Sequence, residues 1–199
     1  VALLDVQVAM LANMNANFLI SGQAPRRWGN AHPNIVPYQA FRAADQWIVV
    51  AVGNDDQYRR FCELGERPDL LHDQRFARNR DRVRNRDTLV PLIAALIAAH
   101  PAAWWLEGLE RAGVPCGPIN DLAQVFDNEQ VRARGLRIEL ERDDAGSVPM
   151  VGSPLKMSAT PPSYRLPPPR LGEHTEQVLR EVLGYDAAAI AAAIGAGSG

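Results

Sequence analysis

The chain has 199 residues, 47% apolar and 22% charged, which is enough to bury a sizeable hydrophobic core without disulfide staples. Its 21 basic and 23 acidic residues give a net charge of −2, which argues against a strongly basic nucleic-acid-binding protein. Two cysteines are too few for a disulfide scaffold, and no apolar run reaches the roughly 18–20 residues of a membrane span. We therefore expect a cytoplasmic protein that binds neither nucleic acid nor membranes.

The first 20 residues predict one helix, because their apolar side chains recur at helical spacing on more than one face. The run ends at Ser21 and Gly22, a common helix stop. No side chain at its start can cap the first backbone N–H groups. We therefore expect this helix to pack inside a larger body, with further protein on its N-terminal side.

A loop and a β-hairpin are predicted next. Residues 23–34 are rich in turn formers and have no clear periodicity. Residues 36–42 and 47–52 read as two strands joined by a short turn. The second strand is apolar on both faces, so we expect it to lie centrally in its sheet.

Helices are predicted over residues 57–64, 81–99 and 102–112, with an irregular stretch at 68–76. The first has side-chain oxygens at Asn54 for an N-cap. Glycine and proline residues punctuate the ends of these segments. This pattern indicates a small body of helices packed on the hairpin.

The remaining residues change in character. Residues 114–118 read as a rigid connection, and 160–169 hold five prolines, typical of an extended surface strap. The other elements that we expect are helices over 120–126, 131–134, 173–183 and 186–194 and strands over 136–141, 147–151 and 155–158.

Six arginines lie close together before and inside the predicted helix over 81–99: Arg75, Arg78, Arg80, Arg82, Arg84 and Arg86. Such a cluster can bind phosphate groups. Arginine supplies almost all of the chain's cations, however, and three aspartates lie within or beside the cluster, at positions 73, 81 and 87. We therefore expect a solvated face, with phosphate binding as the alternative.

The loop before the first strand carries His32, Asn34 and Tyr38, residue types that often form sites when a rigid scaffold presents them. The alternative is that the polar side chains only bond their own turns. Cys116 has no base readable beside it, so we do not expect a nucleophile there. The residues alone show no complete active site.

Four segments, in matching order and spacing, resemble class III CoA-transferases of the CaiB/BaiF family. The resemblance runs over nearly the whole chain, and it is greatest to enzymes of the succinate–hydroxymethylglutarate CoA-transferase type. The segments are VALLDVQVAML (1–11), RWGNAHPNIVPYQAF (27–41), GVPCGPIN (113–120) and LGEHT (171–175).

The resemblance implies covalent catalysis by an aspartate, which forms an acyl anhydride and then a CoA thioester. In the family this aspartate lies upstream of the counterpart of Val1, and Asp5 does not match its motif. We therefore expect no catalytic residue in this chain and no activity from it alone. The resemblance also implies coenzyme A thioesters and carboxylic acids as substrates, no permanently bound cofactor, no metal, and an interlocked homodimer.

By the same resemblance the fold is α+β, related to α/β proteins. We expect residues 1–28 to be a helix and linker from a large domain. Residues 29–113 would form a small α+β domain with a central hairpin or sheet and packed helices, and 114–199 a segment returning to a Rossmann-like large domain absent from this chain. His32, Asn34 and Tyr38 are then the predicted substrate-binding residues at the rim of the small domain.

Two other functions fit the sequence. An acyl-CoA racemase shares this fold, and its proton-transfer pair would also lie upstream. A non-catalytic dimerisation module would use the apolar face of residues 1–20 as an interface.

Overall fold

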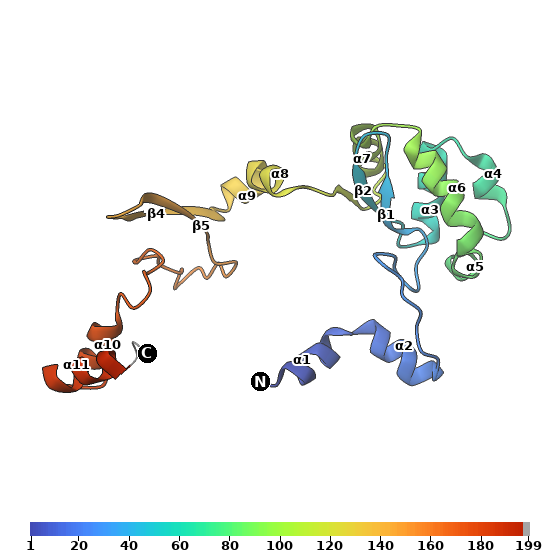
Figure 1. Cartoon of the computed structure of the whole chain (residues 1–199). Coiled ribbons are helices and arrows are strands. Elements are labelled where there is room, and N and C mark those ends of the chain that lie inside the picture. Colours follow the sequence, from blue (N-terminus) through green and yellow to red (C-terminus); the bar gives the residue numbers. More distant parts are fainter. Residues whose placement is uncertain (197–199) are drawn as a thin grey trace. The chain divides into compact units, whose positions relative to one another are not determined.

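The computed structural model describes residues 1–196, and its contacts divide the chain into two units, Val1–Ile119 and Asn120–Gly199. Mixed helices and small antiparallel sheets confirm the predicted α+β class. The elements of the first unit are α1 (Leu3–Met10), α2 (Asn13–Ser21), β1 (Tyr38–Arg42), β2 (Trp47–Ala51), α3 (Asp55–Leu64), α4 (Pro68–His72), α5 (Asn79–Arg84), α6 (Arg86–Ala98), α7 (Ala102–Arg111) and β3 (Cys116–Pro118) (Figure 1).

The hairpin β1–β2 forms as predicted, with Ala40 opposite Val49. β2 is the central strand of a three-stranded antiparallel sheet in the order β1-β2-β3. The rigid connection predicted at 114–118 contains β3, where Cys116 pairs with Val50. A three-residue strand between prolines carries no alternating pattern, so only its partner β2 defines it.

Helices α3, α6 and α7 surround the core beside this sheet (Figure 1). Asn54 caps α3 by accepting a hydrogen bond from Gln57 N at 2.8 Å. α3 turns Tyr58, Phe61 and Cys62 into the core. The largest apolar side chains of the core are Trp105, Tyr58, Phe61, Phe76, Ile48, Leu70, Leu89, Ile93, Ile97 and Leu109.

The helix predicted over 81–99 is two helices, α5 and α6, separated at Asn85. The Asn85 side chain bonds the backbone oxygens of Arg75 and Asp81 at 3.1 and 2.9 Å, and competition of this kind favours a break. Within 68–76, predicted as irregular, the five residues of α4 are helical and begin with Pro68, a residue suited to a first turn.

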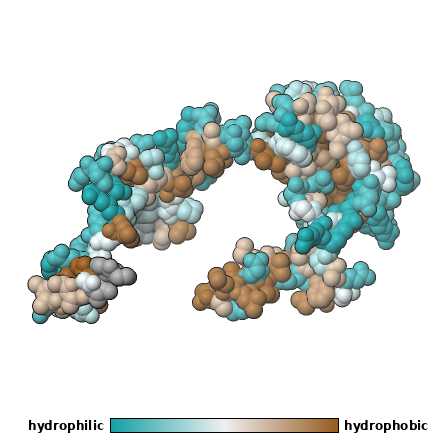
Figure 2. All heavy atoms as spheres, viewed as in Figure 1, coloured by the Kyte–Doolittle hydropathy of each residue, from teal (hydrophilic) through white to brown (hydrophobic). Residues whose placement is uncertain are grey.

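The single helix predicted over residues 1–20 is also wrong, because the chain turns at Ala12, where φ is +42°. α1 and α2 are bent by 78° relative to each other. Neither buries any residue, and hydrophobic residues cover the α1 region in Figure 2. Among the described residues no single helix is long and apolar enough to cross a membrane, and only the bent pairs α1–α2 and α6–α7 reach that length and hydropathy together.

The second unit contains a two-stranded sheet and short helices. A capping box between Asp121 and Gln124 begins the helix that was predicted near residue 120. The predicted strand at 155–158 does not form in the structure, where this stretch is irregular. The elements are α8 (Leu122–Asp127), α9 (Glu129–Ala133), β4 (Arg137–Arg142), β5 (Gly146–Val151), α10 (Thr175–Glu181) and α11 (Ala187–Ala196).

Candidate functional site

The loop of residues 30–38 lies along the outer edge of β1. Asn30 Oδ1 accepts a hydrogen bond from Ala40 N at 3.0 Å, and His32 N donates to Tyr38 O at 2.9 Å. These bonds use backbone groups of β1 that its own sheet leaves unpaired. The loop is therefore fixed to the domain by hydrogen bonds along the strand edge.

The three predicted site residues lie in this one loop, and each has a partner. The His32 and Tyr38 rings are stacked, with centroids 5.2 Å apart. His32 Nδ1 accepts from Asn34 N at 3.1 Å. The Asn34 amide donates to Asn17 Oδ1 on α2 at 3.1 Å. These contacts order the loop, while its role in substrate binding stays a prediction.

A hollow of about 500 Å³ lies between α2 and this loop. Amide and hydroxyl groups and one guanidinium line it, a set of donors that suits an oxyanion such as a carboxylate. Asn34 lines the hollow, whereas His32 and Tyr38 do not. The residues around it are Met14, Asn17, Ser21, Gln23, Ala24, Pro25, Arg26, Trp28, Pro33 and Asn34.

Three polar side chains of the α5–α6 segment bind the loop, and two of them, Arg82 and Arg86, are buried. Arg86 Nη2 donates to His32 O and Pro33 O at 3.0 and 2.7 Å. Arg82 Nε donates to Val36 O at 2.7 Å. Asn79 Nδ2 donates to Asn34 O at 2.8 Å, and its Oδ1 accepts from Val36 N at 3.2 Å. The loop backbone thus has partners from three side chains.

The solvated face predicted for the arginine cluster is wrong at two of the six positions. Arg82 is 0% exposed and Arg86 is 7% exposed, because both guanidinium groups bond backbone oxygens of neighbouring segments. The other four arginines are exposed. The missed signal is spacing: positions 82 and 86 continue the stripe of Leu89 and Ile93 at intervals of four, three and four residues.

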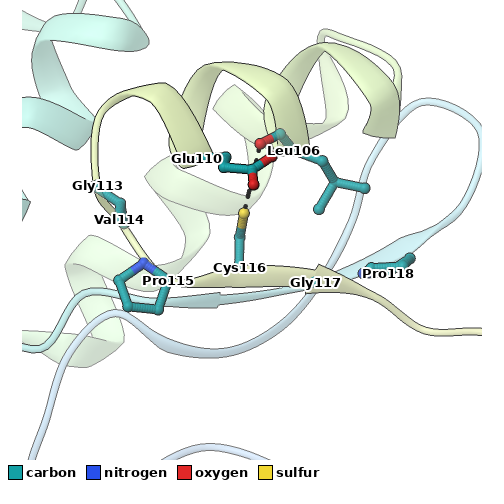
Figure 3. Close-up of a pocket in the computed structure, with 8 residues that line it drawn as sticks. All are labelled: Leu106, Glu110, Gly113, Val114, Pro115, Cys116, Gly117 and Pro118. Carbon is teal, nitrogen blue, oxygen red and sulfur yellow. Dashed lines mark hydrogen bonds between the residues drawn. The ribbon is translucent and has the colours of Figure 1, made fainter. Parts of the chain in front are cut away.

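Cys116 lines a second hollow, of about 470 Å³, between α7 and β3 (Figure 3). Its thiol donates to Leu106 O at 3.7 Å, while the Glu110 carboxylate lies beside it (Figure 3). Burial and the negative charge of Glu110 raise the pKa of this thiol above its ordinary value. A thiol held in its protonated form is a poor nucleophile, which agrees with the sequence-based expectation.

No metal centre is apparent in the part of the chain that the structure describes. Within residues 1–196, no group of three or more His, Cys, Asp or Glu side chains is placed to hold a metal ion. The polar hollow beside Asn34 is the candidate site of this unit, and the loop of residues 30–38, which Arg86 anchors, forms one of its walls.

Comparison with known proteins shows which family the chain belongs to. Residues 1–175 match the profile of CoA-transferase family III. The chain belongs to this family. It is 45% identical over 181 residues to the succinate–glutarate CoA-transferase of Agrobacterium fabrum, an alignment that covers 91% of this chain and 45% of that protein. It is 40% identical over 195 residues to human succinyl-CoA:glutarate CoA-transferase, with 98% and 44% of the two chains covered.

A solved structure supports the same assignment. A CaiB/BaiF family protein from Brucella suis is 37% identical and superposes with a TM-score of 0.74, covering 91% of this chain and 47% of the other. The chain thus spans less than half the length of the CoA-transferase family III proteins it resembles. The family resemblance drawn from the four sequence segments is confirmed.

Proposed function

We propose that this chain is part of an enzyme that moves coenzyme A from an acyl-CoA to a carboxylic acid, with a dicarboxylic acid as acceptor. The observation that carries the proposal is its 45% identity to the succinate–glutarate CoA-transferase over 91% of the chain. The acyl-CoA thioester is then a substrate, and the reaction needs no permanently bound cofactor.

The proposed route is covalent. An aspartate carboxylate outside these 199 residues attacks the donor thioester, breaks its C–S bond and forms a mixed anhydride with release of CoA thiolate. The thiolate attacks the aspartyl carbonyl, which frees the donor acid and leaves an aspartyl–CoA thioester. The acceptor carboxylate attacks that thioester, and the thiolate released then attacks the acceptor carbonyl, which restores the aspartate.

In this proposal the loop of residues 30–38 forms the rim of the substrate site, with His32, Asn34 and Tyr38 as contact residues. The hydrogen bonds from Arg86 and Asn79 support this role, because a loop that is already ordered loses little entropy when substrate binds. The donors around the hollow beside Asn34 suit the carboxylate of the acid substrate.

We also propose that the protein acts in the cytoplasm as an interlocked homodimer. Large apolar side chains along α1 and α2 are exposed, including Leu3 at 89% and Ile20 at 88%. A contiguous apolar surface of this kind is typical of an interface. We propose that the small domain spans residues 29–113 and that α1 and α2, which precede it, belong to the large domain.

Steady-state kinetics of the complete protein with succinyl-CoA and glutarate test the proposal. Asn34→Asp keeps the shape of the side chain but places a negative charge on the hollow, so the KM for glutarate should rise about tenfold. Asn128→Asp is the matched control, because aspartate caps α9 as well as asparagine does.

Two outcomes would contradict the proposal. The first is that the wild-type protein transfers no coenzyme A to glutarate, which would rule out the proposed activity. The second is an unchanged KM for glutarate in Asn34→Asp, which would show that this loop does not contact the acid substrate. The 199-residue chain assayed by itself should give no turnover.

A further inference from the structure

The two buried arginines of the α5–α6 segment differ in their counter-charge. Arg82 lies 2.8 Å from the Asp55 carboxylate. Arg86 has no carboxylate partner among the described residues, and its recorded hydrogen bonds go to backbone oxygens only. Burial and the nearby charge of Arg26 lower the pKa of Arg86. The charge of Asp87 acts in the opposite direction, although its carboxylate forms no ion pair with Arg86. A buried cation without an ion pair is costly, so Arg86 is in an environment that a bound anion would improve.

Two guanidinium groups contact the indole of Trp28. The Cζ atom of Arg86 is 4.2 Å from the ring centroid, and that of Arg26 is 4.3 Å from it. Within residues 1–196, two buried side-chain polar atoms lack a hydrogen-bond partner, Trp28 Nε1 and Arg86 Nε. Both unpaired N–H groups therefore belong to one stacked pair of side chains.

A hollow of about 300 Å³ opens beside this stack. Three arginines line it, and the one acidic residue on its wall, Asp87, is already 3.3 Å from Arg26. The local charge is therefore positive. The lining residues are Arg26, Arg27, Trp28, Gln39, Arg86, Asp87, Val90 and Pro91.

We propose that the hollow formed by Arg26, Trp28 and Arg86 is a binding site for a carboxylate of the acid substrate. Arg26 and Arg86 supply the charge, and the unpaired N–H groups of Trp28 and Arg86 are donors that a carboxylate can accept from. Arg26, which is 56% exposed, is the side chain that moves off the indole to admit the ligand.

The site is connected to the loop proposed as the substrate rim. Arg86 bonds the backbone of His32 and Pro33, and Arg26 and Trp28 also line the hollow beside Asn34. An acid bound at Arg26 therefore lies next to the loop. A carboxylate fits better than a phosphate, because phosphate sites commonly use several backbone N–H groups at a helix N-terminus, and side chains define this hollow.

Isothermal titration of the full chain with glutarate tests the site. The identity of the ligand rests on the proposed function, but the titration reports binding alone, so a protein that fails to transfer coenzyme A can still pass it. We expect saturable binding that is weakened about tenfold in Arg26→Gln and in Trp28→Phe. Trp28→Phe keeps an aromatic ring beside the arginines and removes the indole N–H together with its five-membered ring.

Matched controls change the same residue types elsewhere. Arg111→Gln alters an exposed arginine on α7, and Trp104→Phe alters a half-exposed tryptophan on the same helix, so both should bind glutarate as wild type does. Thermal melts of all variants establish that they are folded. Arg86→Gln is avoided as the sole test because it also removes the bonds to the loop.

Three results would overturn the proposal. The first is equal glutarate affinity in wild type, Arg26→Gln and Trp28→Phe. The second is the absence of glutarate binding by the wild-type chain. The third is inorganic phosphate binding as tightly as glutarate, which would make the hollow a general anion site and not one for a carboxylate.

Discussion

Arg82 joins four segments of the first unit through one side chain. Its guanidinium donates to Val36 O at 2.7 Å, to Phe76 O at 3.0 Å and to the Asp55 carboxylate at 2.8 Å. It also lies 4.3 Å from the Tyr58 ring centroid. Because water cannot replace these partners at a fully buried position, removing the side chain leaves several acceptors unpaired.

Arg82→Ala should therefore lower the free energy of unfolding by about 3 kcal/mol. Arg84→Ala, on the same helix, removes an arginine that is 77% exposed and 3.9 Å from Asp81, and should change stability by less than about 0.5 kcal/mol. Urea denaturation of both variants measures the difference. Equal losses in the two variants would show that the buried hydrogen bonds contribute nothing beyond the charge.

The reactivity of the Cys116 thiol should depend on pH. Its pKa is raised by burial and by Glu110, so at pH 8 less thiolate is present than in a free cysteine. Alkylation of Cys116 should follow a pH profile shifted upward, and Glu110→Gln should shift it back down. Glu107→Gln, on an exposed turn of α7, is the control.

The pH profile of alkylation must be assigned to Cys116 and not to Cys62. Cys62 is 1% exposed, and burial raises its pKa to about 11, so it should stay unmodified in the folded protein. Mass spectrometry of the labelled peptides separates the two sites. A Glu110→Gln profile identical to that of wild type would mean that this carboxylate does not act on the thiol.

At the scale of elements, the end of α7 directs the chain into β3. Gly113 has φ +65°, and its N–H donates to Glu110 O while Val114 N donates to Leu109 O, both at 2.9 Å. This is a Schellman motif, in which glycine adopts the left-handed conformation without strain.

Gly113→Ala should destabilise the protein by about 1–2 kcal/mol, because alanine is strained at positive φ. Its Cβ would also lie 2.8 Å from Arg60 Nη1, which donates to Ala112 O. Gly117→Ala, in β3, has no atom within 4 Å of the added Cβ and should be neutral to within about 0.5 kcal/mol. Thermal melts compare the two variants, and equal melting temperatures would contradict the role of the turn.

Elements with local signals were predictable from the sequence. The hairpin β1–β2 has β-branched residues around a short turn, α3 has its cap at Asn54, and α7 lies between Pro101 and Gly113. β3 was missed because its pairing with β2 is set by a residue pair distant in the sequence, Val50 and Cys116. The turn at Ala12 has neither glycine nor proline to announce it.

The candidate site was predictable only in part. Asn34 was named from the residue types of its loop, and it lies on a polar hollow. The contribution of Arg86 was not predictable, because whether an arginine is solvated or buried depends on the backbone oxygens that the fold brings to it. Those oxygens belong to His32 and Pro33, more than 50 residues away in the sequence.

At the scale of the whole molecule, the burial of apolar side chains differs between the two units. Nearly all of the buried hydrophobic residues lie between Val36 and Val114, while the second unit contributes Ile190. Large apolar side chains stay exposed on α1, α2 and α10. Apolar side chains exposed in this way are consistent with the proposed dimer and with a chain that spans less than half the length of its relatives.

We propose that the complete protein transfers coenzyme A between two acids. The most direct measurement supplies it with succinyl-CoA and glutarate labelled with ¹⁸O in its carboxylates, and follows the products by mass spectrometry. We expect one glutaryl-CoA for each succinyl-CoA consumed. We also expect ¹⁸O in the succinate released after the first turnover, because the anhydride with glutarate leaves one acceptor oxygen on the aspartate, which passes it to succinate in a following cycle. Succinate that carries solvent oxygen, formed without glutaryl-CoA, would show hydrolysis and contradict the account.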